Sequence, residues 1–374
     1  MSATALLVGG TGPTGPHLAR GLLERGYDVT VFHSGRHETD ELPDVEHFHG
    51  DPFSADGIAA ALGDRRYDVA VATYGRVRLL AEALAGRCDQ LLTVGGVPVY
   101  RGFLPPEAAQ PAGMPLLARE TAERVPAEDP PGAIYGVGAV RRTEDAVFAL
   151  HEAGAFAATI FRYPMLYGPR NPHAWEWSTV WRVLDGRTWM ALPDGGLAVH
   201  SRCGARNAAA AVLLALDRPE AAGGRAFNLA DDDQFSLRQW IELILAHLGA
   251  DLELVSVPGD LPNPGWALLP FRSRCSPHAV VDTAAIRHDL GYRDVQPARE
   301  GLAETVDWLV AHADEARANP TVIDVFDYAA EDRFRAAYDR AAAQLAEAGA
   351  PFHAIPEMPV PQTASGSRGK ETRR

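Results

Sequence analysis

The stretch TALLVGGTGPTGPHLARGLLERG, residues 4–26, decides the fold of this chain. Residues 4–10 form an apolar run that ends in glycines, which is typical of a strand buried on both faces of a parallel sheet. Residues 15–26 have the apolar spacing of an amphipathic helix and stop at a glycine. The stretch therefore predicts a strand, a tight glycine turn and a helix, in that order.

The glycine turn predicts a phosphate-binding site. Small residues let the backbone turn tightly and bring a pyrophosphate against the helix N-terminus, where free N–H groups and the helix dipole favour negative charge. The alternative is a flexible turn without a ligand, but the position between a strand and a helix favours the phosphate. The residues assigned to this site are Gly9, Thr11, Gly12, Pro13, Thr14 and Gly15.

Strand and helix patterns alternate through the first half of the chain. We expect strands at 27–35, 44–51, 67–75, 90–96 and 156–164, and helices at 56–64, 77–87 and 135–153. Alternation of this kind predicts a parallel sheet with right-handed crossovers and helices on both faces. The predicted fold class is therefore α/β, a doubly wound parallel sheet (Rossmann); a smaller, mostly C-terminal α/β substrate domain is what the family resemblance given below implies.

The predicted domains follow from changes in pattern along the chain. Residues 1–165 are assigned to the dinucleotide-binding domain, with 101–132 as a proline-rich insertion or lid loop, and 166–320 to a substrate domain with returns to the first core. Later elements are helices at 175–185, 236–249, 300–313 and 327–348 and strands at 225–230 and 252–257. A C-terminal helix is expected within 321–350, and 351–374 is expected to be disordered because it is rich in Pro, Ser, Gly and charge.

Composition and charge exclude some classes of function. The net charge of −14 argues against a nucleic-acid partner, since such proteins need a basic face. Cys88, Cys203 and Cys275 are too few and too scattered for a disulfide framework or a zinc site, and no metal site is assigned. No signal peptide and no membrane span is expected, so we expect a soluble, reduced, cytoplasmic protein without a membrane partner.

The end of the second strand indicates which coenzyme the turn serves. NAD sites present an acid there to the adenosine ribose, whereas NADP sites use arginine and small donors. This chain has His33, Ser34 and Arg36 at that point, which favours NADP, with NAD as the second choice. Asp51 and Pro52, after the third strand, are assigned to the adenine.

At this point the chain resembles the extended short-chain dehydrogenase/reductases, the superfamily of the NAD-dependent epimerases and dehydratases. The resemblance covers roughly residues 3–315. It rests on GGTGPTG (9–15), HGDPFSADGIAAAL (49–62), TVGGVPVY (93–100), YGVGAVRRTED (135–145), FRYPMLYGPRNP (161–172), RAFNLADD (225–232) and AAIRHDLGY (284–292).

The sequence departs from the pattern of that superfamily at the residues that handle protons. The superfamily places a Ser or Thr after the fifth strand, where this chain has Gly95 and Gly96, and a Lys four residues after the Tyr, where it has Ala139. An engineered Lys→Ala change would explain Ala139 but not the glycines. Of the catalytic set Tyr135 alone remains, so the chain resembles an atypical member that lacks the Ser and the Lys.

Residues i and i+4 share a helix face, so a lysine at 139 would lie beside the Tyr135 hydroxyl. Unit charges about 4 Å apart attract by roughly 4 kcal/mol at an effective dielectric near 20, and this stabilisation of tyrosinate is absent. Neither arginine nearby can replace the lysine, because Arg141 lies on another face of the helix and Arg142 lies too far along it. We expect Tyr135 to act as a proton donor or acceptor but to be a poor base.

The resemblance also implies contacts at the remaining strand ends. To the coenzyme it assigns Thr73, Thr93, Tyr135, Pro164 and Leu166; to the substrate it assigns Gly96, Tyr100, Met165, Tyr167, Arg170, Trp175 and His200. Met165 replaces the usual asparagine, which favours a moderately apolar or sugar-like small molecule. Trp177 and Trp181 lie one turn apart, and we interpret them as core residues rather than as a wall of the substrate site.

Three functions remain open from the sequence. The first is an NAD(P)-dependent oxidoreductase or epimerase/dehydratase that acts on a hydroxyl or carbonyl group. The second is a non-redox lyase, isomerase or hydrolase on the same scaffold, and the third is a catalytically silent dinucleotide sensor. A homodimer that pairs helices 77–87 and 135–153 is a further possibility from the resemblance.

Overall fold

A computed structural model describes residues 2–36, 38–129, 136–270, 277–317 and 324–350. The chain divides into two compact units, with the boundary after Phe326. The second unit contains the helix α12 (Tyr328–Gly349), and each unit is described by itself. The tail at 351–374, Tyr135 and Cys275 lie outside the described residues.

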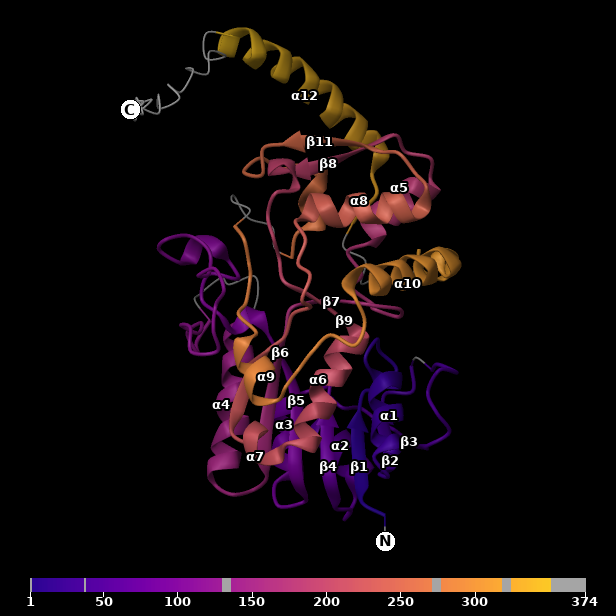
Figure 1. Ribbon diagram of the computed structural model, residues 1–374, viewed down its shortest axis with the longest axis vertical. Coiled ribbons are helices and arrows are strands. Elements are labelled where there is room, and N and C mark those ends of the chain that lie inside the picture. The colour runs from indigo at the N-terminus through magenta and orange to yellow at the C-terminus, as the bar shows by residue number, and fades with distance from the viewer. Residues whose placement is uncertain (1, 37, 130–135, 271–276, 318–323, 351–374) are drawn as a thin grey trace, which may run out of the picture. The chain divides into compact units, whose positions relative to one another are not determined.

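A seven-stranded parallel sheet forms the centre of the first unit (Figure 1). Its strand order is β10-β6-β5-β4-β1-β2-β3, and each neighbouring pair is parallel. The order reverses between β1 and β4, as it does in doubly wound folds. The strands are β1 (Thr4–Val8), β2 (Asp28–His33), β3 (Glu46–His49), β4 (Tyr67–Ala72), β5 (Cys88–Gly96), β6 (Ala157–Tyr163) and β10 (Arg225–Asn228).

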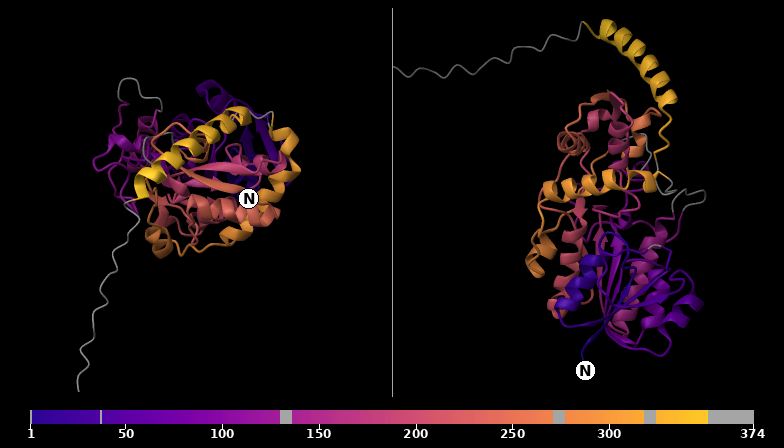
Figure 2. Two further views of the ribbon diagram at one scale, coloured as in Figure 1. Left: turned by 90° about the horizontal axis from the view of Figure 1, so that it is seen from above. Right: turned by 90° about the vertical axis from the view of Figure 1, so that its right-hand side faces the viewer.

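Helices cover both faces of this sheet because successive strand residues point to opposite sides. Leu7 and Val31 face a cluster with α1 and α6, whereas Leu6 and Phe32 face a cluster with α2, α3 and α4 (Figure 2). This arrangement confirms the predicted fold class. The helices are α1 (Gly15–Glu24), α2 (Ala55–Leu62), α3 (Val77–Leu84), α4 (Gly138–Glu152) and α6 (Ala205–Asp217).

A smaller α/β region follows the sheet. Two further strand pairs are parallel, β7 (Met165–Tyr167) with β9 (Arg202–Gly204) and β8 (Trp189–Pro193) with β11 (Glu253–Val257). Its helices are α5 (Trp177–Leu184), α8 (Leu237–Leu248), α10 (Ala298–Ala311) and α11 (Ala313–Ala316), whereas α7 (Pro219–Ala222) and α9 (Ala284–Asp289) pack on the seven-stranded sheet.

Two tryptophans of α5 help to form the core of this region. Trp177 and Trp181 are 2% and 4% exposed and pack with Trp240, Val306 and Leu309, which confirms their interpretation as core residues. Their ring centroids lie 4.5 Å apart. Burial of such large side chains stabilises the region by roughly 2 kcal/mol or more for each ring.

The helix α4 begins later than its apolar pattern predicts. It starts at Gly138, whose N–H donates to Asp129 Oδ1 over 2.7 Å. Arg142 pairs with the same carboxylate, and Arg141 donates to the carbonyl oxygen of Val125 over 2.9 Å. These contacts fasten the first turns of α4 to the proline-rich segment, so both arginines serve as structural tethers.

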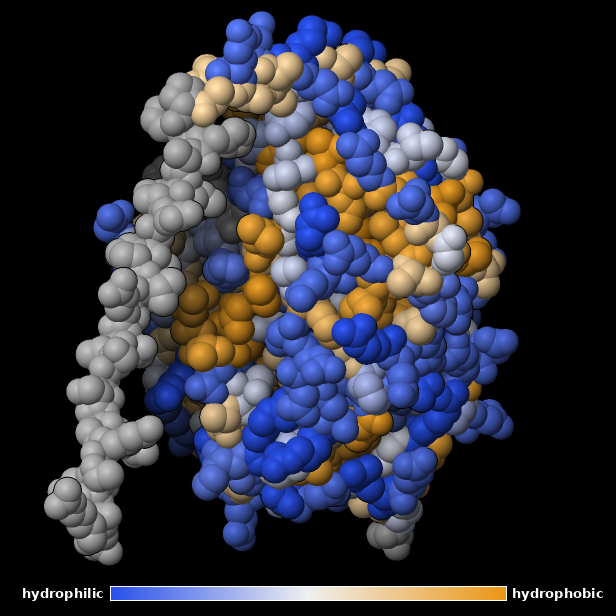
Figure 3. Space-filling model, turned by 45° about the horizontal axis from the view of Figure 1, so that its top comes forward, coloured by the Kyte–Doolittle hydropathy of each residue, from blue (hydrophilic) through white to orange (hydrophobic). Residues whose placement is uncertain are grey.

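The surface of the described residues is mixed in character. Figure 3 shows a face on which hydrophilic side chains predominate and apolar side chains gather in patches between them. Within the described residues, no helix combines the length and the apolar character that a membrane crossing requires.

Candidate functional site

The glycine turn between β1 and α1 leaves open space beside the helix N-terminus. A Cβ built on Gly15 would lie 1.8 Å from the carbonyl oxygen of Gly10, so only glycine permits this close approach. A Cβ built on Gly12 would meet no described atom within 4 Å. The turn is thus tightly packed at Gly15 and open at Gly12.

The N-terminus of α1 is suited to an anion. Among the described residues, Thr14 at the N-cap makes no side-chain capping bond, and the first turn contains no acidic residue. The positive end of the helix dipole therefore has no protein carboxylate to neutralise it. Together with the space at Gly12, these features fit the pyrophosphate of a dinucleotide.

Two predicted coenzyme contacts use their hydroxyl groups within the sheet. Thr73 Oγ1 donates to the carbonyl oxygen of Val8 over 3.1 Å, and Thr93 Oγ1 donates to that of Ala72 over 3.2 Å. Both bonds hold neighbouring strand ends together beside the glycine turn. Thr73 follows β4 and Thr93 lies within β5, and their predicted contact with a coenzyme stays a prediction.

The end of β2 differs from its predicted role in one respect. His33 is 2% exposed, and its Nε2 lies 3.1 Å from Nδ1 of His47 on β3, so its side chain faces β3. Ser34 accepts a 3.4 Å bond from the backbone N–H of Arg36, whose side chain is exposed. Asp51 is also exposed, whereas Pro52 is buried. Arg36 is thus accessible to a ligand, and His33 is not.

The carboxyl end of β5 is where the resemblance predicts a Ser or Thr and the sequence has two glycines. Gly95 and Gly96 pair with Arg162 and Tyr163 of β6. Gly96 has φ −158° and ψ 158°, an extended conformation that any residue adopts, and a Cβ there would lie 3.0 Å from Cδ of Pro98. A side chain at this position therefore requires only a small shift. Ala139 lies in the first turn of α4 and is exposed.

A buried ion pair joins α4 to β6 behind this edge. Arg162 Nε and Nη2 each donate to one oxygen of Glu144 over 2.8 Å, and both side chains are almost fully buried. Arg162 also donates to the hydroxyl oxygen of Tyr100, which in turn donates to Asn228. Such bidentate bonds between charged groups are among the strongest in proteins.

Tyr100 therefore lies in the interior. It is fully buried, and burial raises the pKa of its hydroxyl. Its hydroxyl is engaged by Arg162 and Asn228, so contact with a substrate would require both bonds to break.

A second buried network surrounds Asp231. Its carboxylate accepts from the Tyr167 hydroxyl over 2.7 Å, from Asn207 Nδ2 over 2.8 Å and from the backbone N–H of Gly204 over 3.0 Å. Burial raises the pKa of Asp231 to about 6, although these donors oppose the shift. Tyr167, a predicted substrate contact, is thus engaged in holding β7 and β9 together.

The remaining predicted substrate residues lie in different surroundings. Met165 is buried, Trp175 is partly exposed, and Arg170 pairs with Glu41 from the loop after β2. His200 is 1% exposed, and burial lowers its pKa to about 3, so it is neutral at physiological pH. Pro164 and Leu166 are partly exposed on either side of Met165. The carboxyl edge of the sheet therefore brings together the glycine turn, Gly96 and the 164–166 segment, but not His200 or Tyr100 as accessible groups.

A family model decides the classification. The model described as "NAD dependent epimerase/dehydratase family" matches residues 5–230, more than half of the chain. The chain belongs to this family. A comparison with curated proteins found no match.

Solved structures of epimerases and dehydratases share the fold of this family member. A UDP-glucose 4-epimerase from Thermotoga maritima, solved with UDP-glucose, is 18% identical, with a TM-score of 0.66 over 83% of this chain and 99% of the other. A dTDP-glucose 4,6-dehydratase from Streptomyces venezuelae, solved with NAD, is 19% identical, with a TM-score of 0.63 over 83% and 98%. A UDP-N-acetylglucosamine 4-epimerase from Methanobrevibacter ruminantium is 16% identical, with a TM-score of 0.64 over 83% and 100%. At identities this low, the structural similarity establishes the shared fold alone.

Sequence reasoning missed several polar residues of this epimerase/dehydratase family member. Glu144 and Asp231 accept most of the buried hydrogen bonds described above; both lie within stretches that carry the resemblance, 135–145 and 225–232, but neither was assigned a role. His47 and His49 were also missed, although their alternation in EHFHG, residues 46–50, places both on one face of a strand. That alternation was the available signal.

Proposed function

We propose that this protein binds NAD(P) at the glycine turn and acts on a hydroxyl or carbonyl group of a small molecule with an incomplete proton-handling set. The observation that carries the proposal is the contrast between Gly15, which the turn needs for packing, and Gly12, where the turn leaves space. A structural turn has no need of the second glycine, whereas a pyrophosphate that approaches the backbone does.

The residues that would hold the coenzyme lie along one edge of the sheet. The turn and the N-terminus of α1 would bind the pyrophosphate, and the nicotinamide, when bound, supplies or accepts a hydride. We place NADP ahead of NAD because Arg36 is exposed and available to a 2′-phosphate. The description of the family favours NAD, so the experiment below measures the affinity for both coenzymes.

The proton-handling set of this proposal is reduced to Tyr135, which lies outside the described residues. Gly96 and Ala139 offer no hydroxyl and no charge at the positions of the absent Ser and Lys. Tyr135 then acts as a proton donor or acceptor without a cation to stabilise tyrosinate. The incompleteness of the set predicts slow chemistry.

The proposed substrate is a sugar-like or moderately apolar molecule. Two of the similar structures were solved with UDP-glucose and with UDP-N-acetylmuramic acid, which supports a nucleotide-linked sugar. Met165 in place of asparagine supports a less polar ligand. The proposed substrate site keeps four of the predicted contacts, Gly96, Met165, Arg170 and Trp175. It leaves out Tyr100, Tyr167 and His200, because all three are buried and the hydroxyl groups of the two tyrosines are hydrogen-bonded within the protein.

The proposal also includes a domain boundary, an oligomeric state and a cellular setting. We place the boundary between coenzyme and substrate domains at 165/166, and we retain a homodimer through α3 and α4. Cys88 and Cys203 are free and buried, which supports a reduced, cytoplasmic setting.

The experiment that tests dinucleotide binding is calorimetry of Gly12→Val with NADP and with NAD. A side chain at Gly12 meets no described atom, so we expect unchanged stability and a loss of affinity of at least about tenfold, or about 1.4 kcal/mol. Gly349→Val is the matched control, because its Cβ also meets nothing and its φ is ordinary. Wild-type protein that binds neither coenzyme, or Gly12→Val that binds as tightly as wild type, would refute the proposal.

A catalytically silent dinucleotide sensor is the second candidate. The glycine at 96 and the alanine at 139 favour it, since both substitutions remove groups that chemistry needs and binding does not. Tight coenzyme binding without turnover of any hydroxyl or carbonyl compound tested would favour the sensor. Turnover without net oxidation of the coenzyme would favour the non-redox lyase or isomerase.

A further inference from the structure

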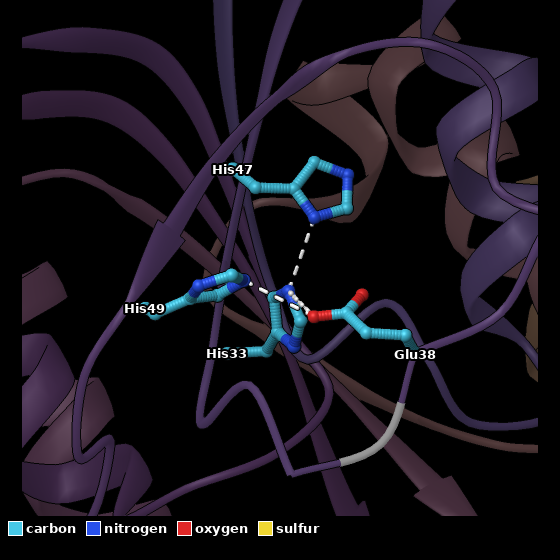
Figure 4. A group of neighbouring side chains, drawn as sticks. All are labelled: His33, Glu38, His47 and His49. Atoms are coloured by element: carbon cyan, nitrogen blue, oxygen red, sulfur yellow. Dashed lines mark hydrogen bonds and ion pairs between the residues drawn. The ribbon is translucent and has the colours of Figure 1, made fainter.

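Four side chains of metal-ligand type converge at the edge of the sheet (Figure 4). They are His33 at the end of β2, Glu38 in the following loop, and His47 and His49 on the edge strand β3. Each offers one nitrogen or oxygen atom, and these four atoms all lie within 4.8 Å of one another. Among the described residues, this group is the one set of histidines and carboxylates with such spacing.

The fold itself brings three of these residues together. In the parallel pair of β2 and β3, His33 lies opposite His49. His47 and His49 are two residues apart on a strand and therefore point to the same side of the sheet. Phe32 and Phe48 point to the other side, toward the cluster of α2 and α3. The burial of those phenylalanines fixes the register that aligns the three imidazoles.

The distances suit a single ion of zinc size. Ligands 2.0–2.1 Å from a tetrahedral zinc ion lie about 3.3 Å from each other. Here Nε2 of His33 lies 3.1 Å from Nδ1 of His47 and 3.7 Å from Oε1 of Glu38, and Nε2 of His49 lies 3.1 Å from the same oxygen. The three rings are nearly perpendicular to one another, with interplanar angles of 78°, 90° and 84°. Shifts of a few tenths of an ångström to about one ångström complete a four-coordinate arrangement.

The hydrogen bonds of the cluster are compatible with a metal. One proton must lie between Nε2 of His33 and Nδ1 of His47, because two bare nitrogens would repel each other. A metal ion bound to Nε2 of His33 would take the place of this proton, and the proton would move to Nδ1 of His33, which now accepts a 3.3 Å bond from the backbone N–H of Gly35.

We propose that His33, Glu38, His47 and His49 bind one divalent transition-metal ion, with zinc as the ion that three imidazoles and one carboxylate suit best. The ion is structural, because four protein ligands fill a tetrahedral site. It fastens the loop after β2 to the edge strand, next to the position that reads the adenosine ribose in dinucleotide-binding folds. The inference is independent of the proposed function, and it departs from the sequence analysis, which assigned no metal.

The competing explanation is a hydrogen-bonded polar cluster without an ion. Both explanations account for the 3.1 Å contacts, since hydrogen bonds have the same length. They differ in what happens when a carboxylate or an imidazole is removed. A hydrogen-bonded cluster loses a weak, partly exposed bond, whereas a metal site loses most of its affinity for the ion.

The test uses full-length protein freed of any histidine tag, stripped with a chelator and titrated calorimetrically with zinc chloride. We expect one ion per chain and, with Co²⁺ in place of zinc, the intense visible absorption of a tetrahedral complex. His49→Gln and Glu38→Gln alter exposed side chains, so both variants will fold. Each is expected to weaken zinc binding by about tenfold to a hundredfold.

His247→Gln is the matched control, because His247 also pairs with a carboxylate, Asp307, over 2.7 Å and lies outside the cluster. It should bind zinc as the wild type does. A stripped wild-type protein that takes up no zinc or cobalt would overturn the proposal. So would zinc affinity that His49→Gln and Glu38→Gln leave unchanged, because the ion would then lie elsewhere.

Discussion

Replacement of Glu144 by glutamine should destabilise the protein more than any exposed charge change. Arg162 and Glu144 form a two-bond ion pair with both side chains at most 4% exposed. Glutamine removes the negative charge and turns one of the two acceptor oxygens into an NH2 donor, which then faces an N–H of the buried guanidinium. Loss of one partner of a buried pair costs about 3–5 kcal/mol, because the other charge stays desolvated.

Replacement of the arginine of this pair should lower the free energy of unfolding by less than replacement of the glutamate. Arg162→Met leaves Glu144 with Arg124, whose Nη1 lies 3.3 Å from its Oε2 and whose side chain is partly exposed. The double variant Arg162→Met, Glu144→Leu removes both charges and should recover much of the loss, since apolar replacements of buried pairs are often neutral. With Glu144→Leu as the second single variant, the wild type, Arg162→Met and the double variant complete a cycle with a favourable coupling free energy between the two sites.

Urea-induced unfolding at neutral pH, followed by circular dichroism, measures these free energies of unfolding. Asp217→Asn is the control, because it breaks an exposed pair with Arg25 and should cost no more than about 1 kcal/mol. A loss below about 1 kcal/mol in Glu144→Gln, or a double variant that loses the sum of the single changes, would refute the reasoning.

Two other predictions concern catalysis and pH. Gly96→Ser with Ala139→Lys introduces a hydroxyl and a positive charge, so hydride turnover measured by nicotinamide absorbance should rise by about 10²–10⁴-fold. Gly96→Ser with Ala139→Met is the uncharged control. An equal rise in turnover in that control would contradict the prediction. The pKa of Asp231 is raised to about 6 in the folded protein from 3.8, so the folded state binds this proton more tightly than the unfolded state. The free energy of unfolding should then fall by up to about 3 kcal/mol as the pH rises from about 4 to about 6, and Asp231→Asn should remove this fall. Equal pH slopes of wild type and variant in urea unfolding would speak against it.

The fold could be predicted because its signals are local. The apolar run at 4–8, the glycines of the turn and the amphipathic helix at 15–24 each occupy neighbouring residues, and parallel sheets repeat this unit. The buried position of Trp177 and Trp181 followed from their spacing for the same reason.

The polar networks could not be predicted because their partners lie far apart in the chain. Asp231 is bonded to Tyr167, Gly204 and Asn207, and only the pairing of β7 with β9 brings these residues together. The start of α4 depends on Asp129 in the preceding proline-rich segment, so a carboxylate outside the helix and not the apolar pattern of the helix fixes its first turn. The histidine cluster needed the register of β2 and β3, which the sequence does not contain.

The late chain segments that return to the sheet limit how this protein can be recombined with its relatives. The helix α6 packs so closely on α1 that a Cβ at Gly21 would lie 2.2 Å from a methyl carbon of Leu213, and Phe227 of β10 stacks on Phe161 with ring centroids 6.3 Å apart. A gene fragment that ended at residue 165 would encode a sheet that lacks the edge strand β10 and has only α1 on one face, so we expect an insoluble product. Chimeras that exchange substrate specificity should therefore keep residues 205–228 from the same parent as residues 1–165.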